Sequence, residues 1–472
     1  MTVIDTYYGH SPSSWESLKS SMALRFALRG CKLEPSNPQY WKAVSTNLVD
    51  DLFLLEPSDQ ASASDWDPNR DLIVSTVRMG YGHHRIALGV SSYGSKFGRE
   101  SRLLDLLSSP RDEAHAIKRL DEVYSMMSRL SADLGGWVEA FWGKLMTQGG
   151  VDSARLAYMI ASELAALLDC IPRDTPFISA YPINGHLAVK LGFKKVVNLI
   201  FDNDPQHFLI VPGALNLVQT TSSYERLRLL GVPKDQVGVG GHWVARDLVD
   251  NVERDNHLRI TRAEKGSPTR LVVAIGGAGA QKAFVFDYLK GLVPLLRDGK
   301  VRVILNLGDH AHLREPCDEL LQTLGINSEK LHGFDALNDF AEKHPLDEMS
   351  DTSLQPLTVF SFDKHFEAVR ATDRLMQLAD VLVTKPSELA FVPVPKLHIR
   401  RVGDHEAASA RRAAELGDGT LEQREIADAV RMTELLSSGV EFIGPMAERI
   451  IENTKNGVYS GAEVAVQHAI GS

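Results

Sequence analysis

The stretch of residues 271–292, LVVAIGGAGAQKAFVFDYLKGL, strongly limits how this chain can fold. Leu271–Ile275 is an apolar run that is too short for a helix and is typical of a strand buried on both faces. The glycines after it permit a tight turn, and from Gln281 onward the apolar spacing becomes helical. A strand, a glycine turn and a helix in this order direct several N–H donors and a helix-dipole end at one point, which suits a phosphate group.

The letters of this turn match neither of the common phosphate-binding motifs. A P-loop needs Gly-Lys-Ser/Thr, but Lys282 is followed by alanine, and the dinucleotide fingerprint needs a third glycine where Lys282 stands. Two interpretations therefore stay open at this point. Either Gly276, Gly277 and Gly279 form a phosphate loop with Gln281 and Lys282, or the turn is a tight structural corner without a ligand.

Composition limits the class of protein. A chain of 472 residues exceeds one ordinary core and predicts two domains. With 51 Lys and Arg against 61 Asp and Glu, the net charge of −10 argues against a nucleic-acid partner. The three cysteines stand far apart, which suits a reducing compartment and supports neither a zinc site nor a disulfide framework. No apolar run reaches the roughly 20 residues of a membrane span. We expect a cytoplasmic protein, with peripheral membrane association left open.

A second strand–glycine–helix unit begins at Asp71. Asp71–Val77 predicts a strand, and Gly80, Gly82 and His83 lie in the turn before a small-residue helix. Strands and helices alternate along most of the chain, which indicates parallel, doubly wound sheets. The predicted fold class is therefore α/β, with two Rossmann-like doubly wound domains facing a cleft and a helical N-terminal extension.

Changes of pattern along the chain set the expected boundaries. Helical spacing is found in Trp15–Leu28 and in Gln39–Leu55. A helical insertion is expected to include Leu103–Leu107. The charged stretch Asp250–Arg270 is expected to link the two domains. The expected parts are an accessory segment and linker at 1–70, a first domain at 71–255 with a helical insertion at 99–170, a second domain at 265–435, and a helical tail at 436–472.

Four places in the chain together resemble the GT-B glycosyltransferases, and most closely family 28. That family includes the monogalactosyldiacylglycerol synthases and the N-acetylglucosaminyltransferase of peptidoglycan synthesis. The four places are the turn Gly80-Tyr81-Gly82-His83, the run Val196–Gly240 with Asp202, the stretch 271–292, and Ala379–Glu388 with the polar step Asp404-His405-Glu406 after it. The resemblance covers residues 71–435, and its strength lies in the order and spacing of the pieces.

This resemblance implies transfer of a hexose or N-acetylhexosamine from a nucleotide sugar, with uridine diphosphate as the expected carrier. No metal and no other cofactor is expected, because GT-B enzymes stabilise the departing diphosphate with backbone N–H groups, a helix dipole and basic side chains. The residues expected to bind substrate are Gly80, Gly82, Gly276, Gly277, Gly279, Gln281, Lys282, Lys385, Pro386, Ser387, Glu388, Asp404, His405 and Glu406. Among them, Glu388 is expected to accept hydrogen bonds from ribose hydroxyls.

Deprotonation of the acceptor hydroxyl requires a base. His83 follows the first predicted strand of its domain, and a reference pKa of about 6.5 suits proton removal near neutrality. Asp202, a carboxylate at the end of another strand, is the second candidate. The sequence does not decide whether His83 or the adjacent His84 is directed toward a substrate.

Two other functional classes stay open. One is a nucleotide-sugar epimerase of the same fold, in which the donor pocket removes a proton from the sugar. The other is a non-catalytic protein that binds nucleotide sugars. Two departures from the family pattern bear on this choice: the donor segment at Lys385–Glu388 is short, and Ala407–Ala410 supplies no asparagine. The acceptor is not defined, and a lipid-linked acceptor is one of the alternatives.

Overall fold

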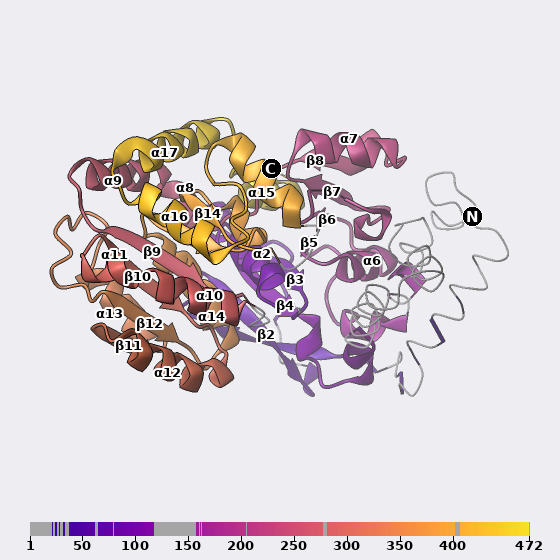
Figure 1. Ribbon diagram of the computed structural model, residues 1–472. Helices are drawn as coiled ribbons and strands as arrows, with labels where there is room; N and C mark the ends of the chain where they lie inside the picture. Colours follow the sequence, from indigo (N-terminus) through magenta and orange to yellow (C-terminus); the bar gives the residue numbers. More distant parts are fainter. Residues whose placement is uncertain are drawn as a thin grey trace, which may run out of the picture. The chain divides into compact units, whose positions relative to one another are not determined.

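The computed structural model describes residues 21, 24, 25, 28, 32, 33, 37–61, 65–78, 80–117, 157–159, 161, 163–203, 205–276, 281–401 and 406–471. The chain divides into two compact units. The first unit contains residues 1–78, 90–240 and 463–472, and the second contains residues 79–89 and 241–462. Each unit is built on one sheet with helices packed against it (Figure 1). The predicted pair of doubly wound α/β domains is therefore confirmed, while the expected cleft stays a prediction.

The sheet of the first unit has the strand order β1-β2-β4-β3-β5-β6-β7-β8. Its first pair is antiparallel, and every other neighbouring pair is parallel. The strands are β1 (Tyr40–Ser45), β2 (Leu52–Ser58), β3 (Asp71–Thr76), β4 (Glu100–Asp105), β5 (Phe177–Ser179), β6 (Val196–Leu199), β7 (Leu215–Val218) and β8 (Val237–Val239).

Two helix predictions in this unit are wrong. The pattern of Gln39–Leu55 belongs to the hairpin β1–β2, in which Trp41 is fully buried and donates a hydrogen bond from Nε1 to the Leu167 carbonyl at 2.9 Å. Leu103 and Leu104 lie in the buried strand β4. Short apolar runs do not separate strand from helix by periodicity alone, and here pairing with a neighbouring strand decided the outcome. Of Trp15–Leu28, the structure describes only four scattered residues.

Helices of the first unit follow its strands. α6 (Pro182–Lys190) comes after β5, and its Asn184 donates to Ser75 Oγ at 2.8 Å and to the Thr76 carbonyl at 3.0 Å, so the helix start is fixed to the carboxyl end of β3. α7 (Thr221–Leu229) comes after β7, with Thr220 as its N-cap. α18 (Gly461–Ile470) ends the described chain.

The sheet of the second unit is entirely parallel, in the order β11-β12-β10-β9-β13-β14. The strands are β9 (Thr269–Ala274), β10 (Val301–Asn306), β11 (Ser328–His332), β12 (Leu357–Ser361), β13 (Val381–Thr384) and β14 (Lys396–His398). β9 is buried along its whole length, as its continuous apolar run predicts. After β9 the chain builds β10, β11 and β12 on one side and then β13 and β14 on the other.

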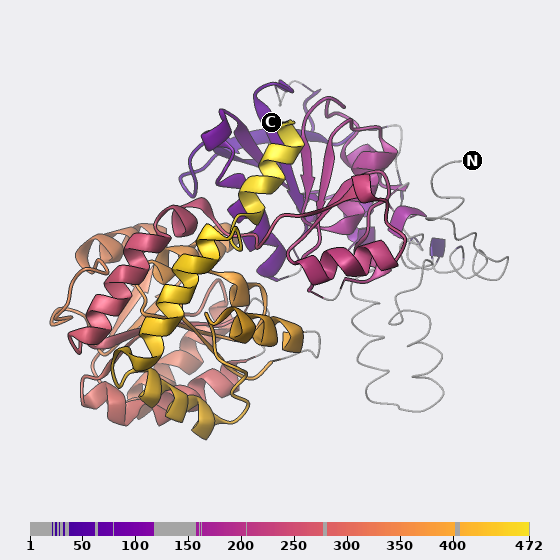
Figure 2. The same ribbon diagram turned by 90° about the horizontal axis from the view of Figure 1, so that it is seen from above.

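One face of this sheet is covered by a continuous apolar core. Leu271, Val273 and Ile275 from β9 and the loop after it contribute to it, together with residues of the neighbouring strands. The covering helices are α10 (Lys282–Gly291), α11 (Val293–Arg297), α12 (Arg314–Leu324), α16 (Ile426–Leu436) and α17 (Val440–Lys455). α17 lies side by side with α9 (Val252–Glu264), as Figures 1 and 2 show.

α9 replaces the linker that was expected at Asp250–Arg270. The prediction was wrong because part of the charge of this stretch is buried: Asp255, Arg259 and Arg262 of α9 are buried, and Arg262, which is 1% exposed, pairs with Asp351 and Asp380. A buried charged helix with paired side chains has the same composition as a solvated linker.

Two further helices, α13 (Phe334–Lys343) and α14 (His365–Met376), belong to this unit, and Phe340 of α13 packs against Phe360 of β12.

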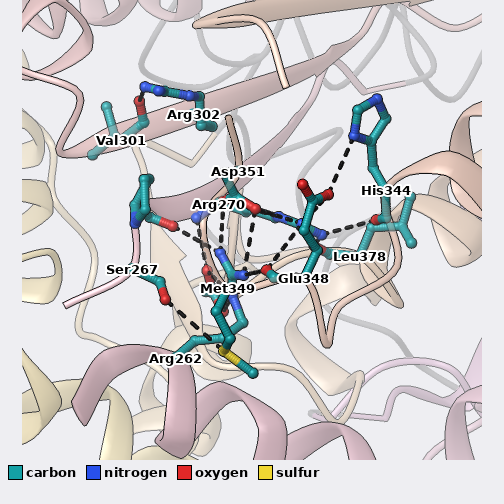
Figure 3. Close-up of polar contacts among 12 residues, drawn as sticks. Arg262, Ser267, Arg270, Val301, Arg302, His344, Glu348, Met349, Asp351 and Leu378 are labelled. Carbon is teal, nitrogen blue, oxygen red and sulfur yellow. Dashed lines mark hydrogen bonds and ion pairs between the residues drawn. The ribbon is translucent and has the colours of Figure 1, made fainter. Parts of the chain in front are cut away.

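A buried ionic cluster lies at the amino-terminal end of the strands, away from their carboxyl ends (Figure 3). Asp351 accepts from Arg262 Nη2 at 2.8 Å and from Arg270 Nη2 at 2.6 Å, and all three side chains are at most 1% exposed. Asp380, which precedes β13, accepts from the Arg262 Nε at 3.0 Å. The cluster fixes α9 and the loop around Asp351 to the start of β9, so we assign it a structural role.

Candidate functional site at the carboxyl edge of the second sheet

The strand order of the second sheet defines where a ligand site is expected. β10, β9 and β13 are adjacent and parallel, so their carboxyl ends meet at one edge. The chain leaves β9 toward opposite sides of the sheet, which makes this edge the topological switch point, where open α/β sheets bind ligands. The candidate site therefore consists of the loops after these three strands.

The described parts of these loops are in contact. His310, after β10, has its Nε2 3.1 Å from the carbonyl oxygen of Gly276, after β9. A methyl group placed on Gly276 would lie 3.4 Å from Cε of Lys385, after β13. The Lys385 ammonium in turn forms an ion pair with Glu406, the first residue of α15 (Glu406–Leu416). A glycine backbone, a histidine and a lysine thus lie together at the switch point.

The glycine turn that follows β3 in sequence belongs to the second unit. Gly80 has φ of +89°, a conformation that favours glycine. A methyl group placed on Gly82, the first residue of α2 (Gly82–Ser91), would lie 3.1 Å from Oε2 of Glu388. The turn at Gly80–Gly82 and the segment Lys385–Glu388, predicted separately from the sequence, therefore lie against each other.

The start of α10 has features of an anion site. Among the described residues no side chain caps this helix, and the basic Lys282 is its first residue, although a helix N-terminus favours acidic groups. Gln281 is 6% exposed and donates from its amide nitrogen to the Arg400 carbonyl, while its Oε1 has no hydrogen-bond partner among the described residues. The N–H groups of a helix start, a lysine and a buried amide oxygen suit a ligand that carries both anionic and hydroxyl groups.

Four side chains form a continuous polar array beside these loops. The Tyr81 hydroxyl donates to Oδ1 of Asp309 and accepts from the Asp309 backbone N–H at 2.9 Å. Oδ2 of Asp309 lies 3.0 Å from Nδ1 of His365, the first residue of α14. Nε2 of His365 lies 3.0 Å from Nδ1 of His84, which is fully buried. The Tyr81 ring also stacks on His310, with centroids 5.6 Å apart, so the array continues to the loop contact at Gly276.

A second set of ion pairs holds α2 on α14. Arg85 pairs with Asp373, and Arg370 joins Asp373 at 3.3 Å to Asp247 at 2.7 Å. Burial raises the pKa of Asp373 above its usual value. Burial also acts to raise the pKa of Asp247, but the Arg370 charge and hydrogen bond outweigh it and the pKa is lowered. These buried pairs fix the direction of α2, and with it the turn at Gly80–Gly82.

The other predicted site residues are placed as follows. Pro386 and Ser387 follow β13 in the loop that carries Lys385. Asp202 lies in the first unit, three residues after the end of β6, and is partly buried. His83 lies in the first turn of α2 and is also partly buried. Gly277, Gly279, Asp404 and His405 lie outside the described residues.

The sequence analysis missed the roles of Tyr81, His84, Asp309, His310 and His365 in this arrangement. A signal existed for two of them, because Asp309 and His310 come three and four residues after a buried strand, where polar side chains reach the ligand edge. For His365 there was none, since a histidine at a helix start carries no distinctive pattern. The contacts that join these side chains connect residues that are 228 and 281 positions apart in the chain, and the periodicity of apolar residues does not predict such contacts.

Over the described parts of the chain, no three His, Cys, Asp or Glu side chains are grouped so that they could hold a metal ion. Metal independence stays a prediction. Among the described helices, none has the length and apolar character needed to cross a membrane.

Two family models match the chain. The model described as Domain of unknown function (DUF6938) matches residues 232–470, just over half of the chain, and the model described as Domain of unknown function (DUF6937) matches residues 34–229. The chain therefore belongs to the DUF6938 family. A search of curated proteins found no match.

Solved structures with related architecture include epimerases and glycosyltransferases. UDP-GlcNAc 2-epimerase from Neisseria meningitidis bound to UDP-GlcNAc has 12% identity and a TM-score of 0.47, over 85% of this chain and 100% of that chain. The S. aureus MnaA-UDP structure has 10% identity and a TM-score of 0.46, over 84% and 95%. CalG4, the calicheamicin glycosyltransferase, has 14% identity and a TM-score of 0.42, over 85% and 98%. Similarities of this size carry no conclusion about activity.

Proposed function

We propose that this protein binds a nucleotide sugar at the carboxyl edge of its second sheet and transfers the sugar to an acceptor hydroxyl. The observation that carries the proposal is the meeting of four segments at the switch point: Gly276, His310, Lys385 and the turn at Gly80–Gly82. The order of motifs that resembles family 28 glycosyltransferases supports the same assignment. An epimerase acting on the same donor is the alternative, because it would use the same pocket.

Each group at this edge has a task in the proposed reaction. The departing diphosphate develops negative charge, which the N–H groups at the start of α10 and the Lys282 and Lys385 ammonium groups stabilise. In this proposal the Glu388 carboxylate accepts hydrogen bonds from ribose hydroxyls, and Glu406 holds Lys385 through their ion pair. His83 is the proposed base for the acceptor hydroxyl, with Asp202 as the second candidate.

A substitution at Gly276 tests the phosphate site directly. Gly276→Asp should weaken binding of uridine diphosphate by roughly tenfold to a hundredfold, because it places a carboxylate beside the anion and competes for Lys385. Gly276→Ala is the matched control: among the described residues its methyl group meets the flexible end of Lys385 at 3.4 Å, an ordinary contact distance. Calorimetric titration with uridine diphosphate measures both variants against the wild type.

The outcomes separate the possibilities. Equal affinity of Gly276→Asp and Gly276→Ala would exclude a phosphate at this loop. Release of uridine diphosphate from a UDP-sugar that depends on an added acceptor supports transfer. Conversion of the sugar without an acceptor supports the epimerase, and tight binding with no turnover supports a binding protein.

A further inference from the structure

We propose that Gln281 accepts a hydrogen bond from an uncharged donor of the bound nucleoside, which is either a base N–H group or a ribose hydroxyl. Gln281 thereby selects the nucleoside, although the sequence placed it in a loop for the phosphates. This role rests on the proposed function, because it concerns the same ligand site and names the part of the ligand that Gln281 contacts.

A fixed carbonyl group sets the orientation of the Gln281 amide. The Gln281 Nε2 donates to the backbone carbonyl of Arg400, and because a carbonyl oxygen only accepts, the amide nitrogen is the atom that faces Arg400. The peptide group that carries this carbonyl is held as well, since the N–H of Arg401 donates to Oε1 of Glu422 at 2.8 Å. The Arg400 side chain is anchored by its Nε, which donates to the Arg424 carbonyl at 2.9 Å. The Gln281 Oε1 is therefore directed away from Arg400.

The oxygen of this amide is buried and lacks a donor. Gln281 is 6% exposed, and its Oε1 has no hydrogen-bond partner among the described residues. An unsatisfied buried acceptor is costly, and proteins normally supply a donor from the chain, from water or from a ligand. A phosphate is the wrong partner, because its oxygens are acceptors like Oε1 itself. An N–H group or a hydroxyl group has the hydrogen that Oε1 needs.

The place of Gln281 at the sheet edge favours the nucleoside over the reacting sugar. Gln281 follows β9 and Arg400 follows β14, so their contact spans the carboxyl end of β13, which lies between these strands. Tyr81, on the turn beside the proposed base His83, contacts Asp309 after β10, on the other side of β9. In the proposed reaction the sugar must reach His83, and the diphosphate separates the sugar from the nucleoside. The sugar therefore lies toward β10 and the nucleoside toward β14.

The experiment compares Gln281→Met with Gln423→Met. Methionine keeps the length of the side chain and removes both hydrogen-bonding groups, and Gln281→Ala is a second variant with a smaller side chain. Gln423 is the matched control, because its amide also donates to a backbone carbonyl, that of Leu421 at 3.0 Å, but at the surface. Thermal unfolding verifies that the variants are folded.

Four ligands separate the two sources of the donor in calorimetric titrations. They are uridine diphosphate, cytidine diphosphate, and the 2′-deoxy and 3′-deoxy forms of uridine diphosphate. Cytosine has no hydrogen on N3, where uracil has one, and each deoxy form lacks one ribose hydroxyl. A change in the preference among these ligands identifies the group that Gln281 contacts.

We expect Gln281→Met to bind uridine diphosphate about tenfold to a hundredfold more weakly than the wild type, and Gln423→Met to bind it equally well. The wild type should prefer uridine diphosphate at least about tenfold over the analogue that lacks the donor, and Gln281→Met should lose this preference. Loss of the preference over cytidine diphosphate identifies the base N–H group. Loss of the preference over a deoxy form identifies a ribose hydroxyl.

Three results would overturn the role of Gln281 alone. They are unchanged affinity of Gln281→Met for uridine diphosphate, as expected if only water meets Oε1, a loss by the same factor for all four ligands, and an equal loss in Gln423→Met. Equal binding of all four ligands by the wild type overturns this role without any variant. A wild type that does not bind uridine diphosphate contradicts the proposed function itself, and the role of Gln281 fails with it.

Discussion

Asp351→Ala should lower the free energy of unfolding by about 3–5 kcal/mol, which is the usual cost of removing one partner from a buried ion pair. Asp351 accepts from Arg262 and Arg270 at 2.8 and 2.6 Å, and both guanidinium groups are buried. Without the carboxylate, two positive charges remain in the interior, and Asp380 is in direct contact with only one of the two side chains. Urea unfolding followed by far-UV circular dichroism measures the loss.

A matched control is Asp363→Ala, because Asp363 pairs with Arg314 at the surface, where its side chain is 71% exposed. Exposed pairs contribute little to stability, so this variant should unfold at nearly the wild-type denaturant concentration. Asp351→Asn gives a second comparison. Asp351 has φ of +50°, which asparagine tolerates better than alanine, so Asn removes the charge with less backbone strain. An unfolding midpoint for Asp351→Ala equal to that of Asp363→Ala would contradict the structural role of the cluster.

The same cluster predicts a pH dependence. Burial acts to raise the pKa of Asp351, but hydrogen bonds from Arg270 and Arg262 outweigh it, and the pKa lies below the ordinary value of 3.8. Because the folded-state pKa is lowered, the contribution to stability is present above pH 3.8 and is lost as the pH falls through the folded-state pKa. The stability difference between the wild type and Asp351→Asn should therefore shrink below about pH 4.

Lys396→Met should also destabilise the second unit by about 3–5 kcal/mol. Lys396 on β14 is fully buried, and its ammonium group lies 3.0 Å from Asp418 and donates to the carbonyls of Val392 and Val394. Burial lowers the pKa of Lys396 and raises that of Asp418, which also accepts from the Tyr459 hydroxyl. Removing the ammonium leaves a buried carboxyl and two carbonyls without their donor.

A double variant decides whether the charge pair is the cause. Lys396→Met combined with Asp418→Asn removes both charges and should recover part of the loss, because no unpaired carboxylate remains. Thermal unfolding of the two single variants and the double variant gives the coupling free energy. If the double variant is destabilised by the sum of the single losses, the two side chains do not stabilise each other.

The most successful predictions were those that depend only on residues close together in the sequence. The continuous apolar run of Leu271–Ile275 predicts the buried central strand β9, and the helical spacing from Gln281 onward predicts α10. The sequence predicted one ligand site that contains the turn at Gly80–Gly82 and the segment Lys385–Glu388; the structure places Gly82 against Glu388, and the site itself stays a prediction. The carboxyl ends of parallel strands lie at the same edge of a sheet, so a sequence that predicts the strands also predicts which loops lie at that edge.

The failures have a different physical origin. The hairpin β1–β2 has the apolar spacing of a helix, and pairing between strands decided its structure, because β1 pairs with β2 and β2 also pairs with β4. The charged helix α9 has the composition of a linker, and only the buried acids Asp351 and Asp380 made burial of Arg262 possible.

By itself, then, the sequence determined the alternation of strands and helices, the buried strand β9 and the glycine turn at Gly80–Gly82, because each follows from contacts within a few residues. The ligand site at the strand ends stays a prediction. The tertiary structure alone decided that residues 79–89 belong to the second unit and that His84 meets His365 and Asp309. Those contacts join residues more than fifty positions apart, and their partners are selected by how the elements pack, which no local pattern of side chains specifies.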